Sequence, residues 1–440
     1  MWTYHPDLLA QPAPRYTSYP TAADFHEAVG PEDMDAALDG IADEASISLY
    51  LHIPFCRDIC WYCGCNTGAA NRTARLDAYL ARLEQELALV AARLEGRGRV
   101  RRIAFGGGSP NAMPPGAFLR LVEQIATRLP SGGSSLSVEI DPRGFDQPWA
   151  TALADAGASR VSLGVQTFDP PLQAAIGRVQ PEDQIRRSVA MLRDAGVESI
   201  NVDLMYGLPG QDASSLSATI ETALSMGPER LAVFGYAHVP HLIPRQRRID
   251  DSALPDAEAR FEQAALAHAM LRQAGYAAVG FDHFALPTDA LAMAAADGTL
   301  RRNFQGFTED QADVLVGLGA SAISLFPDRI LQNEKNSGRW HMAIGAGRFA
   351  TARGIHRTAE DRLRGRAIEQ LLCQGAADVA PLLDPAALRA ALLPFEQRGL
   401  VTWCDARVEI APDALPYARV IAARIDRYRS MSSVRFSNAV

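Results

Sequence analysis

Four of the chain's six cysteines lie close together in the stretch HIPFCRDICWYCGCNTG, residues 52 to 68. Their spacing is C-x3-C-x2-C-x-C, at Cys56, Cys60, Cys63 and Cys65. Structural zinc sites usually combine two separated C-x2-C pairs, whereas this loop holds one. A compact loop can more easily place three thiolates on one face of a [4Fe–4S] cube and leave the fourth iron open to a substrate. We therefore expect an iron–sulfur cluster, with zinc or a redox dithiol as the alternatives.

The composition limits where the chain acts and what it binds. Six cysteines in 440 residues are too few for a disulfide framework, and Cys373 and Cys404, which lie apart from the loop, are assigned no function. The N-terminus shows no targeting pattern, and no charge-free apolar stretch reaches the roughly 18 residues of a membrane span. The formal net charge of −8 argues against nucleic-acid binding. We expect a cytoplasmic protein that binds neither nucleic acid nor membrane.

The elements that must position these cysteines follow a βαβ rhythm, in which short β-branched runs alternate with amphipathic segments. The predicted strands are SISLYLHI (46–53), VRRIAF (100–105), SLSVEI (135–140), RVSLGV (160–165), SINVDLM (199–205) and RLAVFGY (230–236). The predicted helices cover 73–95, 115–128, 148–156, 182–195, 214–226 and 256–273. Six parallel units without a nucleotide fingerprint after the first strand favour an α/β fold with a partial (β/α)6 barrel over a doubly wound sheet.

A barrel of this kind carries its chemistry at the carboxyl ends of the strands. Candidate polar and loop residues are predicted at or just beyond those ends: Tyr50, the loop 106–109, Glu139, Gln166, Asp203 and Ala237. A carboxylate at the end of an apolar strand is costly to bury without a partner, which makes Glu139 and Asp203 good candidates for ligand contacts.

The chain divides into four predicted parts. Residues 1–45 form an arm across the main body, 46–285 the barrel, and 286–360 a connecting segment at the barrel mouth. Residues 361–440 read as two helices, a hairpin around LVTWCDARVEI and a final helix, which is a mostly helical, winged-helix-like domain. That part has eleven arginines against nine acidic residues, so a lid is favoured over DNA binding.

Two motifs resemble those of the radical S-adenosylmethionine (SAM) enzymes. They are the C-x3-C-x2-C spacing and the glycine-rich AFGGGSPN, residues 104 to 111. Further stretches are similar, in the same order, to one family of these enzymes, the oxygen-independent coproporphyrinogen III oxidases. These stretches are PRYTSYPT, CGCN, LGVQ, NVDLMYGLPGQ, YAHVP, RNFQGFT and GASAIS. The resemblance covers nearly the whole chain.

The resemblance implies which residues bind the cofactors. Cys56, Cys60 and Cys63 would ligate one [4Fe–4S] cluster, and Cys65 would be an extra cysteine typical of the family but not a ligand. Two SAM molecules would bind. The first would contact Tyr50, Gly107, Glu139 and Ile323. The second would contact Tyr62, Gly108, Ser109, Gln166, Arg178, Asp203 and Ala237. The candidate catalytic residues are Tyr50, Glu139, Cys65, Phe304 and Gln305.

Structural roles compete with some of these assignments. Tyr50, Ala237 and Ile323 also suit barrel packing, and Arg178 also suits a surface ion pair. Glu309 stands where the family usually has a neutral residue, and it would bring a negative charge near a pocket for carboxylates.

The implied reaction is the anaerobic oxidative decarboxylation of two propionates of coproporphyrinogen III to vinyl groups, giving protoporphyrinogen IX in haem biosynthesis. A 5′-deoxyadenosyl radical, made from SAM at the cluster, would start it. The chain would act as a monomer with an unidentified electron donor and acceptor. Arg15, Arg301 and Arg302 are candidates to pair with the substrate carboxylates. The alternatives are a haem chaperone with the same barrel, a haem methyltransferase and a zinc-stabilised regulator.

Overall fold

The computed structural model describes residues 2–70, 73–382 and 384–429. Its centre is a curved twelve-stranded sheet in the order β16-β15-β14-β13-β1-β4-β5-β6-β7-β8-β10-β9. Six neighbouring strands run parallel, as the sequence predicts. They are β1 (Ser46–Ile53), β4 (Arg99–Gly107), β5 (Ser131–Ile140), β6 (Arg160–Gln166), β7 (Ser199–Tyr206) and β8 (Arg230–Gly235). The predicted α/β fold with a partial barrel is thereby confirmed.

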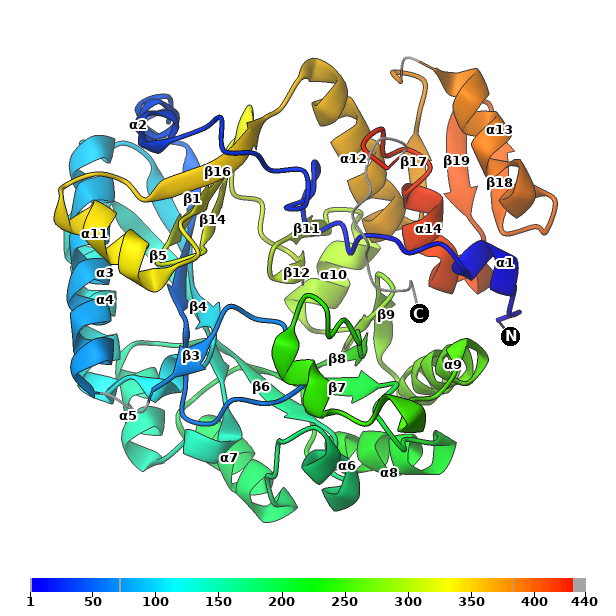
Figure 1. Ribbon diagram of the computed structural model, residues 1–440, viewed down its shortest axis with the longest axis horizontal. Helices are drawn as coiled ribbons and strands as arrows, with labels where there is room; N and C mark the ends of the chain where they lie inside the picture. The colour runs from blue at the N-terminus through cyan, green and yellow to red at the C-terminus, as the bar shows by residue number, and fades with distance from the viewer. Residues whose placement is uncertain (1, 71–72, 383, 430–440) are drawn as a thin grey trace.

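The six predicted helices surround the outer face of this sheet (Figure 1). They are α3 (Thr73–Leu94), α4 (Pro115–Arg128), α5 (Gln147–Asp155), α7 (Glu182–Asp194), α8 (Ala213–Leu224) and α9 (Ala257–Gln273). Aspartate side chains cap the first backbone N–H groups of α5, α8 and α9, which explains where these helices begin. Sequence analysis missed the short α6 (Pro170–Ala175). No helix in the described parts of the chain is long and apolar enough to cross a membrane.

The sheet extends beyond the six parallel strands at both edges. On one side, β13 (Val314–Leu318) runs parallel to β1 and leads into the antiparallel strands β14 (Ile323–Leu325), β15 (Arg329–Asn333) and β16 (Thr351–His356). On the other, β10 (His283–Ala285) and β9 (Ala277–Val279) pair antiparallel beyond β8. Two short strands, β11 (Arg301–Asn303) and β12 (Gly306–Thr308), form a separate hairpin. The connecting segment therefore contributes the strands β11 to β16, together with the helices α10 (Ala290–Ala296) and α11 (Ser337–Gly345).

The C-terminal part has its own three-stranded sheet beside its helices. Its helices are α12 (Ala359–Gln374), α13 (Pro385–Glu396) and α14 (Ala418–Ala422). The predicted hairpin is β18 (Val401–Cys404) with β19 (Arg407–Ile410), and β17 (Ala376–Asp378), which was not predicted, pairs with β19. The last residues of this predicted domain, 430–440, lie outside the described residues. The four predicted domain boundaries stay predictions.

The N-terminal arm links the two parts of the molecule. Its helix α2 (Pro31–Asp39) packs on α3 and β16, whereas α1 (Pro6–Leu9) lies beside the C-terminal helices (Figure 1). The Tyr417 hydroxyl donates to the Thr3 carbonyl at 2.7 Å and accepts from the His5 N–H at 2.9 Å. Leu8, Leu9, Ala13, Tyr16 and Tyr19 of the arm belong to the same apolar cluster as the buried residues of α12 and α14.

Candidate active site: a thiol-lined pocket at the barrel mouth

The cysteine loop is closed at its base by a small parallel pair of strands. β2 (Phe55–Cys56) pairs with β3 (Gly68–Ala69), and the Ala70 N–H donates to the Cys56 carbonyl at 2.8 Å. The Trp61 N–H donates to the Ile176 carbonyl at 3.0 Å. These bonds fix both the ends and the middle of the loop, so its thiols are held against the mouth of the barrel.

All four cysteines of the loop line one pocket of about 470 Å³, which we call the thiol pocket. It brings together twelve of the predicted site residues, namely Cys56, Cys60, Tyr62, Cys63, Cys65, Gly107, Gly108, Glu139, Gln166, Arg178, Asp203 and Ala237. They come from the cysteine loop, from five strands or the loops after them, and, for Arg178, from the segment between α6 and α7. Asp203, however, lies three residues before the end of β7, inside the strand rather than at its tip.

Five predicted residues lie outside the lining of the thiol pocket. Tyr50 is in β1, with its hydroxyl 3.2 Å from His52 Nδ1. Ser109 is buried, and its N–H donates to the Phe55 carbonyl at 2.8 Å. Phe304 and Ile323 pack in one apolar cluster behind the barrel mouth. Gln305 lies in the turn between β11 and β12, where its N–H donates to Asn303.

The glycine-rich loop needs its glycines for packing as well as for any ligand. Gly107 has a φ of 106°, and a Cβ there would lie 2.4 Å from the His52 ring. A Cβ on Gly108 would lie 2.6 Å from the Phe55 carbonyl oxygen. The loop can therefore press against the cysteine loop only without side chains, and it leaves its backbone open to the pocket.

The two pocket carboxylates of interest differ in their partners. Glu139 Oε2 accepts the Gly107 N–H at 3.1 Å, and burial raises the pKa of Glu139 to about 7. Asp203 accepts from Asn201 at 2.7 Å and from Ser162 at 3.0 Å, and burial also raises the pKa of Asp203. Each therefore sits in a site where a cation or a hydroxyl group would stabilise its charged form.

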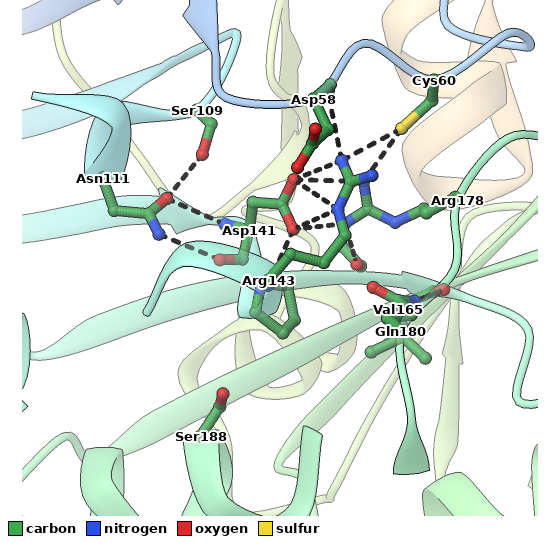
Figure 2. A network of polar contacts seen from close by, with 12 residues as sticks. Asp58, Cys60, Ser109, Asn111, Asp141, Arg143, Val165, Arg178, Gln180 and Ser188 are labelled. Atoms are coloured by element: carbon green, nitrogen blue, oxygen red, sulfur yellow. Dashed lines mark hydrogen bonds and ion pairs between the residues drawn. The ribbon is translucent and has the colours of Figure 1, made fainter. Parts of the chain in front are cut away.

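Two guanidinium groups converge on one thiol (Figure 2). Arg143 and Arg178 each donate to Cys60 Sγ at 3.2 Å, and both also pair with the Asp141 carboxylate. Arg178 is only 6% exposed, so the predicted alternative of a surface ion pair does not describe it. Burial alone would raise the pKa of Asp141, but Arg178 and Arg143 hold it below its usual value.

Asp141, Arg143 and Gln246 also belong to the site, although they were not predicted from the sequence. Asp141 and Arg143 follow Glu139 in EIDPRG, where the proline and the charged pair just after a strand were the available signal. Gln246, in a 3-10 turn after β8, donates to the Tyr62 carbonyl at 2.8 Å and to the Ala237 carbonyl at 3.0 Å. These bonds join the cysteine loop to the segment that follows β8. No pattern in the sequence indicates this role for Gln246.

The thiol environment fits an anionic, thiolate-bound group. The positive charges of Arg143 and Arg178 lie next to Cys60, and hydrogen bonding from Cys65 lowers the pKa of Cys63 to about 6. Burial raises the pKa of Cys56 to about 12, so that thiol favours its neutral form until a metal binds. Among the described residues, no group of three or more His, Cys, Asp or Glu is arranged to hold a single metal ion.

Comparisons with known proteins identify the chain's relatives. Residues 50–223 match the family model described as the Radical SAM superfamily. Oxygen-independent coproporphyrinogen III oxidases of Bradyrhizobium diazoefficiens and Pseudomonas aeruginosa are 43% and 39% identical to the chain. The alignments cover 97% of this chain in both cases, and 97% and 96% of the relatives. A coproporphyrinogen III oxidase from Escherichia coli, a radical SAM enzyme, superposes with a TM-score of 0.91 at 34% identity, over 97% of this chain and 99% of that one.

The fold and the cysteine loop thus define a radical SAM protein, a class that uses a [4Fe–4S] cluster and SAM. Within that class, the chain belongs to the family of oxygen-independent coproporphyrinogen III oxidases. The resemblance seen in the sequence is confirmed.

A second pocket continues from the thiol pocket toward the arm. This aromatic pocket, about 500 Å³ in volume, shares Arg15 and residues 234–237 with the thiol pocket. Its walls include the rings of Tyr206, Phe234, Phe281 and Phe284. This pocket, whose aromatic walls are joined by Arg15, Arg260 and Arg419, therefore opens directly off the site with the cysteines.

The other two predicted carboxylate partners lie elsewhere. Arg301 pairs with Glu369 at 2.9 Å, and Arg302 is buried behind the arm, so neither lines the thiol pocket or the aromatic pocket. Glu309 also points away from these two pockets, because it pairs with Arg102 at 2.9 Å and with Arg160. Its negative charge is neutralised inside the barrel, so the expected conflict with a carboxylate ligand does not arise at those pockets.

Proposed function

We propose that this chain catalyses the oxidative decarboxylation of two propionate side chains of coproporphyrinogen III, which gives protoporphyrinogen IX. Each vinyl group forms as a propionate loses one β-hydrogen atom, carbon dioxide and one electron. The observation that carries the proposal is the convergence of the three predicted ligand thiols, Glu139 and the glycine-rich loop on one pocket, in a chain that matches such oxidases along almost its full length.

The cluster would be held by Cys56, Cys60 and Cys63. A cluster held there would supply the one-electron reduction of SAM on which the removal of the hydrogen atom depends. The chain's own part is electrostatic, because Arg143 and Arg178 place positive charge beside Cys60, at the wall of the pocket that would hold the cluster. Cys65 is exposed and is proposed to act on the substrate side rather than as a ligand.

Two SAM molecules are proposed to share the thiol pocket. Gly107 and Glu139 would bind the first, since the open backbone and the carboxylate suit its amino group and hydroxyls. Tyr50 and Ile323 would complete that site from the neighbouring strands. The second would use the remaining predicted residues: Tyr62, Gly108, Ser109, Gln166, Arg178, Asp203 and Ala237. Phe304 and Gln305 would act from the β11–β12 turn.

The aromatic pocket is proposed to receive the macrocycle. Its rings offer an apolar surface that excludes water, and Arg15 at the shared rim would pair with a propionate. The chain would work as a cytoplasmic monomer, with an external electron donor that reduces the cluster and an acceptor for the final electron.

The test is an anaerobic assay of the reconstituted protein with SAM, a reductant, coproporphyrinogen III and an electron acceptor. We expect protoporphyrinogen IX together with 5′-deoxyadenosine. Cys60→Ser should lose both products, whereas Cys404→Ser, which changes an exposed thiol outside the loop, should keep them. Formation of 5′-deoxyadenosine without protoporphyrinogen IX would reject the oxidase function while keeping the radical chemistry.

A further inference from the structure

A third pocket, separate from the two above, is lined by five arginines. It has a volume of about 370 Å³ and lies between α12, the β11 strand and the arm. We call it the arginine pocket; its cationic residues are Arg301, Arg302, Arg357, Arg362 and Arg366. Glu369 is the one acidic residue among those that line it, and it is already paired with Arg301 at 2.9 Å. The pocket thus has a large excess of positive charge.

One of these arginines is buried with a donor left over. Arg302 is 8% exposed, and its Nε and Nη2 donate to the Arg15 carbonyl at 3.1 and 3.0 Å. Its Nη1 is buried without a hydrogen-bond partner among the described residues. The guanidinium lies over the rings of Phe307 and Phe281, at 4.2 and 4.8 Å from their centroids. A buried charged donor without an acceptor is unfavourable unless a ligand supplies one.

Arg357 feels the charges of two other arginines of the pocket. Burial lowers the pKa of Arg357, and the positive charges of Arg362 and Arg366 lower it further, whereas Asp361 and Glu369 raise it. Arg357 Nε also lacks a partner within the described part of the chain. A bound anion would relieve this repulsion, so the geometry and the charges favour the same kind of ligand.

The backbone of the arm separates the arginine pocket from the thiol pocket and the aromatic pocket. Arg15 lines both the thiol pocket and the aromatic pocket, whereas Tyr16, Ser18 and Tyr19 line the arginine pocket. Arg302 holds the backbone of Arg15 from the far side. Consecutive residues of the arm therefore face a site for the reacting propionates on one side and a cationic pocket on the other.

The proposed substrate supplies the matching charges. Coproporphyrinogen III has four propionates, of which two react and two remain. The remaining pair must be held if the macrocycle is to present the right carbons, and planar guanidinium groups bind carboxylates through paired hydrogen bonds. Arg15 lines the aromatic pocket and its neighbour Tyr16 lines the arginine pocket, so the two pockets lie on either side of the arm.

We propose that the arginine pocket binds carboxylates, and that these are the propionates of coproporphyrinogen III that are not decarboxylated. This inference rests on the proposed function, since it assigns part of the same substrate. It makes Arg362 and Arg366 specificity-determining residues at the mouth of the pocket, and Arg302 the buried donor at its inner end.

The test compares binding of coproporphyrin III, the oxidised tetracarboxylate, to reconstituted full-length protein by porphyrin fluorescence. The double variant Arg362→Gln/Arg366→Gln should raise the Kd about tenfold or more, and should raise the KM for coproporphyrinogen III more than it lowers kcat. The matched control Arg339→Gln/Arg348→Gln makes the same change in net charge on exposed arginines of another helix region and should leave the Kd unchanged. Coproporphyrin III tetramethyl ester, which lacks the charges, should bind both variants alike.

Two results would overturn the inference. One is an equal Kd for coproporphyrin III in the wild type and the Arg362→Gln/Arg366→Gln variant. The other is citrate binding that is lost in this variant while coproporphyrin III binding is kept, because the pocket would then take small free polycarboxylates. Neither depends on turnover. A wild-type protein that binds coproporphyrin III through this pocket but forms no protoporphyrinogen IX would instead contradict the proposed function.

Discussion

Cys65 differs from the other three cysteines of the loop in its surroundings. It is exposed, and both its thiol and its backbone N–H hydrogen-bond to Cys63 Sγ, the N–H at 3.4 Å. A serine at this position keeps that N–H. We expect Cys65→Ser to retain the iron content and the brown absorbance of the reconstituted protein but to lose protoporphyrinogen IX formation. Loss of iron to the level of Cys60→Ser would show that Cys65 is a ligand.

Glu309 allows a second test at the scale of single residues, because its contribution to the stability of the fold depends on pH. Burial alone would raise the pKa of this carboxyl, but Arg102, Arg160 and Arg230 lower it to about 2. Because the folded-state pKa is depressed, the charged form stabilises the fold fully above the unfolded pKa of about 4.3, and the effect is lost as the pH falls toward 2. Glu309→Gln should therefore lower the free energy of unfolding by about 3 kcal/mol at pH 7.

Urea unfolding of the apoprotein at pH 7, 5 and 3.5 would measure this effect. The gap between the wild type and Glu309→Gln should be similar at pH 7 and 5 and smaller at pH 3.5. Glu182→Gln is the matched control, because Glu182 pairs with Arg186 on an exposed helix face and should contribute less than about 1 kcal/mol. A gap that does not narrow at pH 3.5 would contradict the assigned charge state.

At the scale of elements, α3 is clamped to the turn between β13 and β14 by Glu86. This carboxylate is 2% exposed and accepts from the Gly319 N–H at 2.6 Å, from Asn333 at 2.7 Å and from the Trp340 ring N–H at 3.2 Å. Glu86→Ala would leave three buried donors without an acceptor, so we expect a loss of about 3 kcal/mol or more in the free energy of unfolding.

The clamp also bears on function, because the same turn leads into Ile323. We expect Glu86→Ala to weaken SAM binding in addition to lowering the melting temperature. Glu84→Ala, on the same helix but facing Arg120 at 3.9 Å on the surface, should change neither by much. An unchanged melting temperature in Glu86→Ala would mean that the turn is held by other contacts.

The length of an element and the range of its contacts decide whether it could be predicted from the sequence. The six parallel strands were predictable because β-branched runs such as SINVDLM alternate with amphipathic helices, and the barrel then places Glu139 and Gln166 together. The antiparallel strands β14, β10 and β9 are only three residues each, too short to show a period. Gln246 and Arg143 could not be placed because their roles depend on contacts with segments far away in the chain.

At the scale of the whole molecule, the arm connects the barrel to the C-terminal helices. Arg419 donates to the Ala13 carbonyl at 2.6 Å, and Tyr16 donates to Asp426 at 3.0 Å. Removal of residues 1–19 should expose the apolar surface of α12 and α14 that the arm covers. We expect faster amide hydrogen exchange in these two helices and little change in α4 and α5. Equal acceleration throughout the chain would show that the arm stabilises the molecule as one unit.

The distance along the chain between the arm and its partners has a consequence for how the protein is made. Ala13 and Arg419 are separated by 406 residues, and at roughly 5–20 residues per second a ribosome needs about 20 to 80 s to cover that length. The cysteine loop leaves the ribosome long before the helices that dock the arm. The growing chain therefore passes through a period in which the barrel can form before the arm has its docking partners in the C-terminal helices.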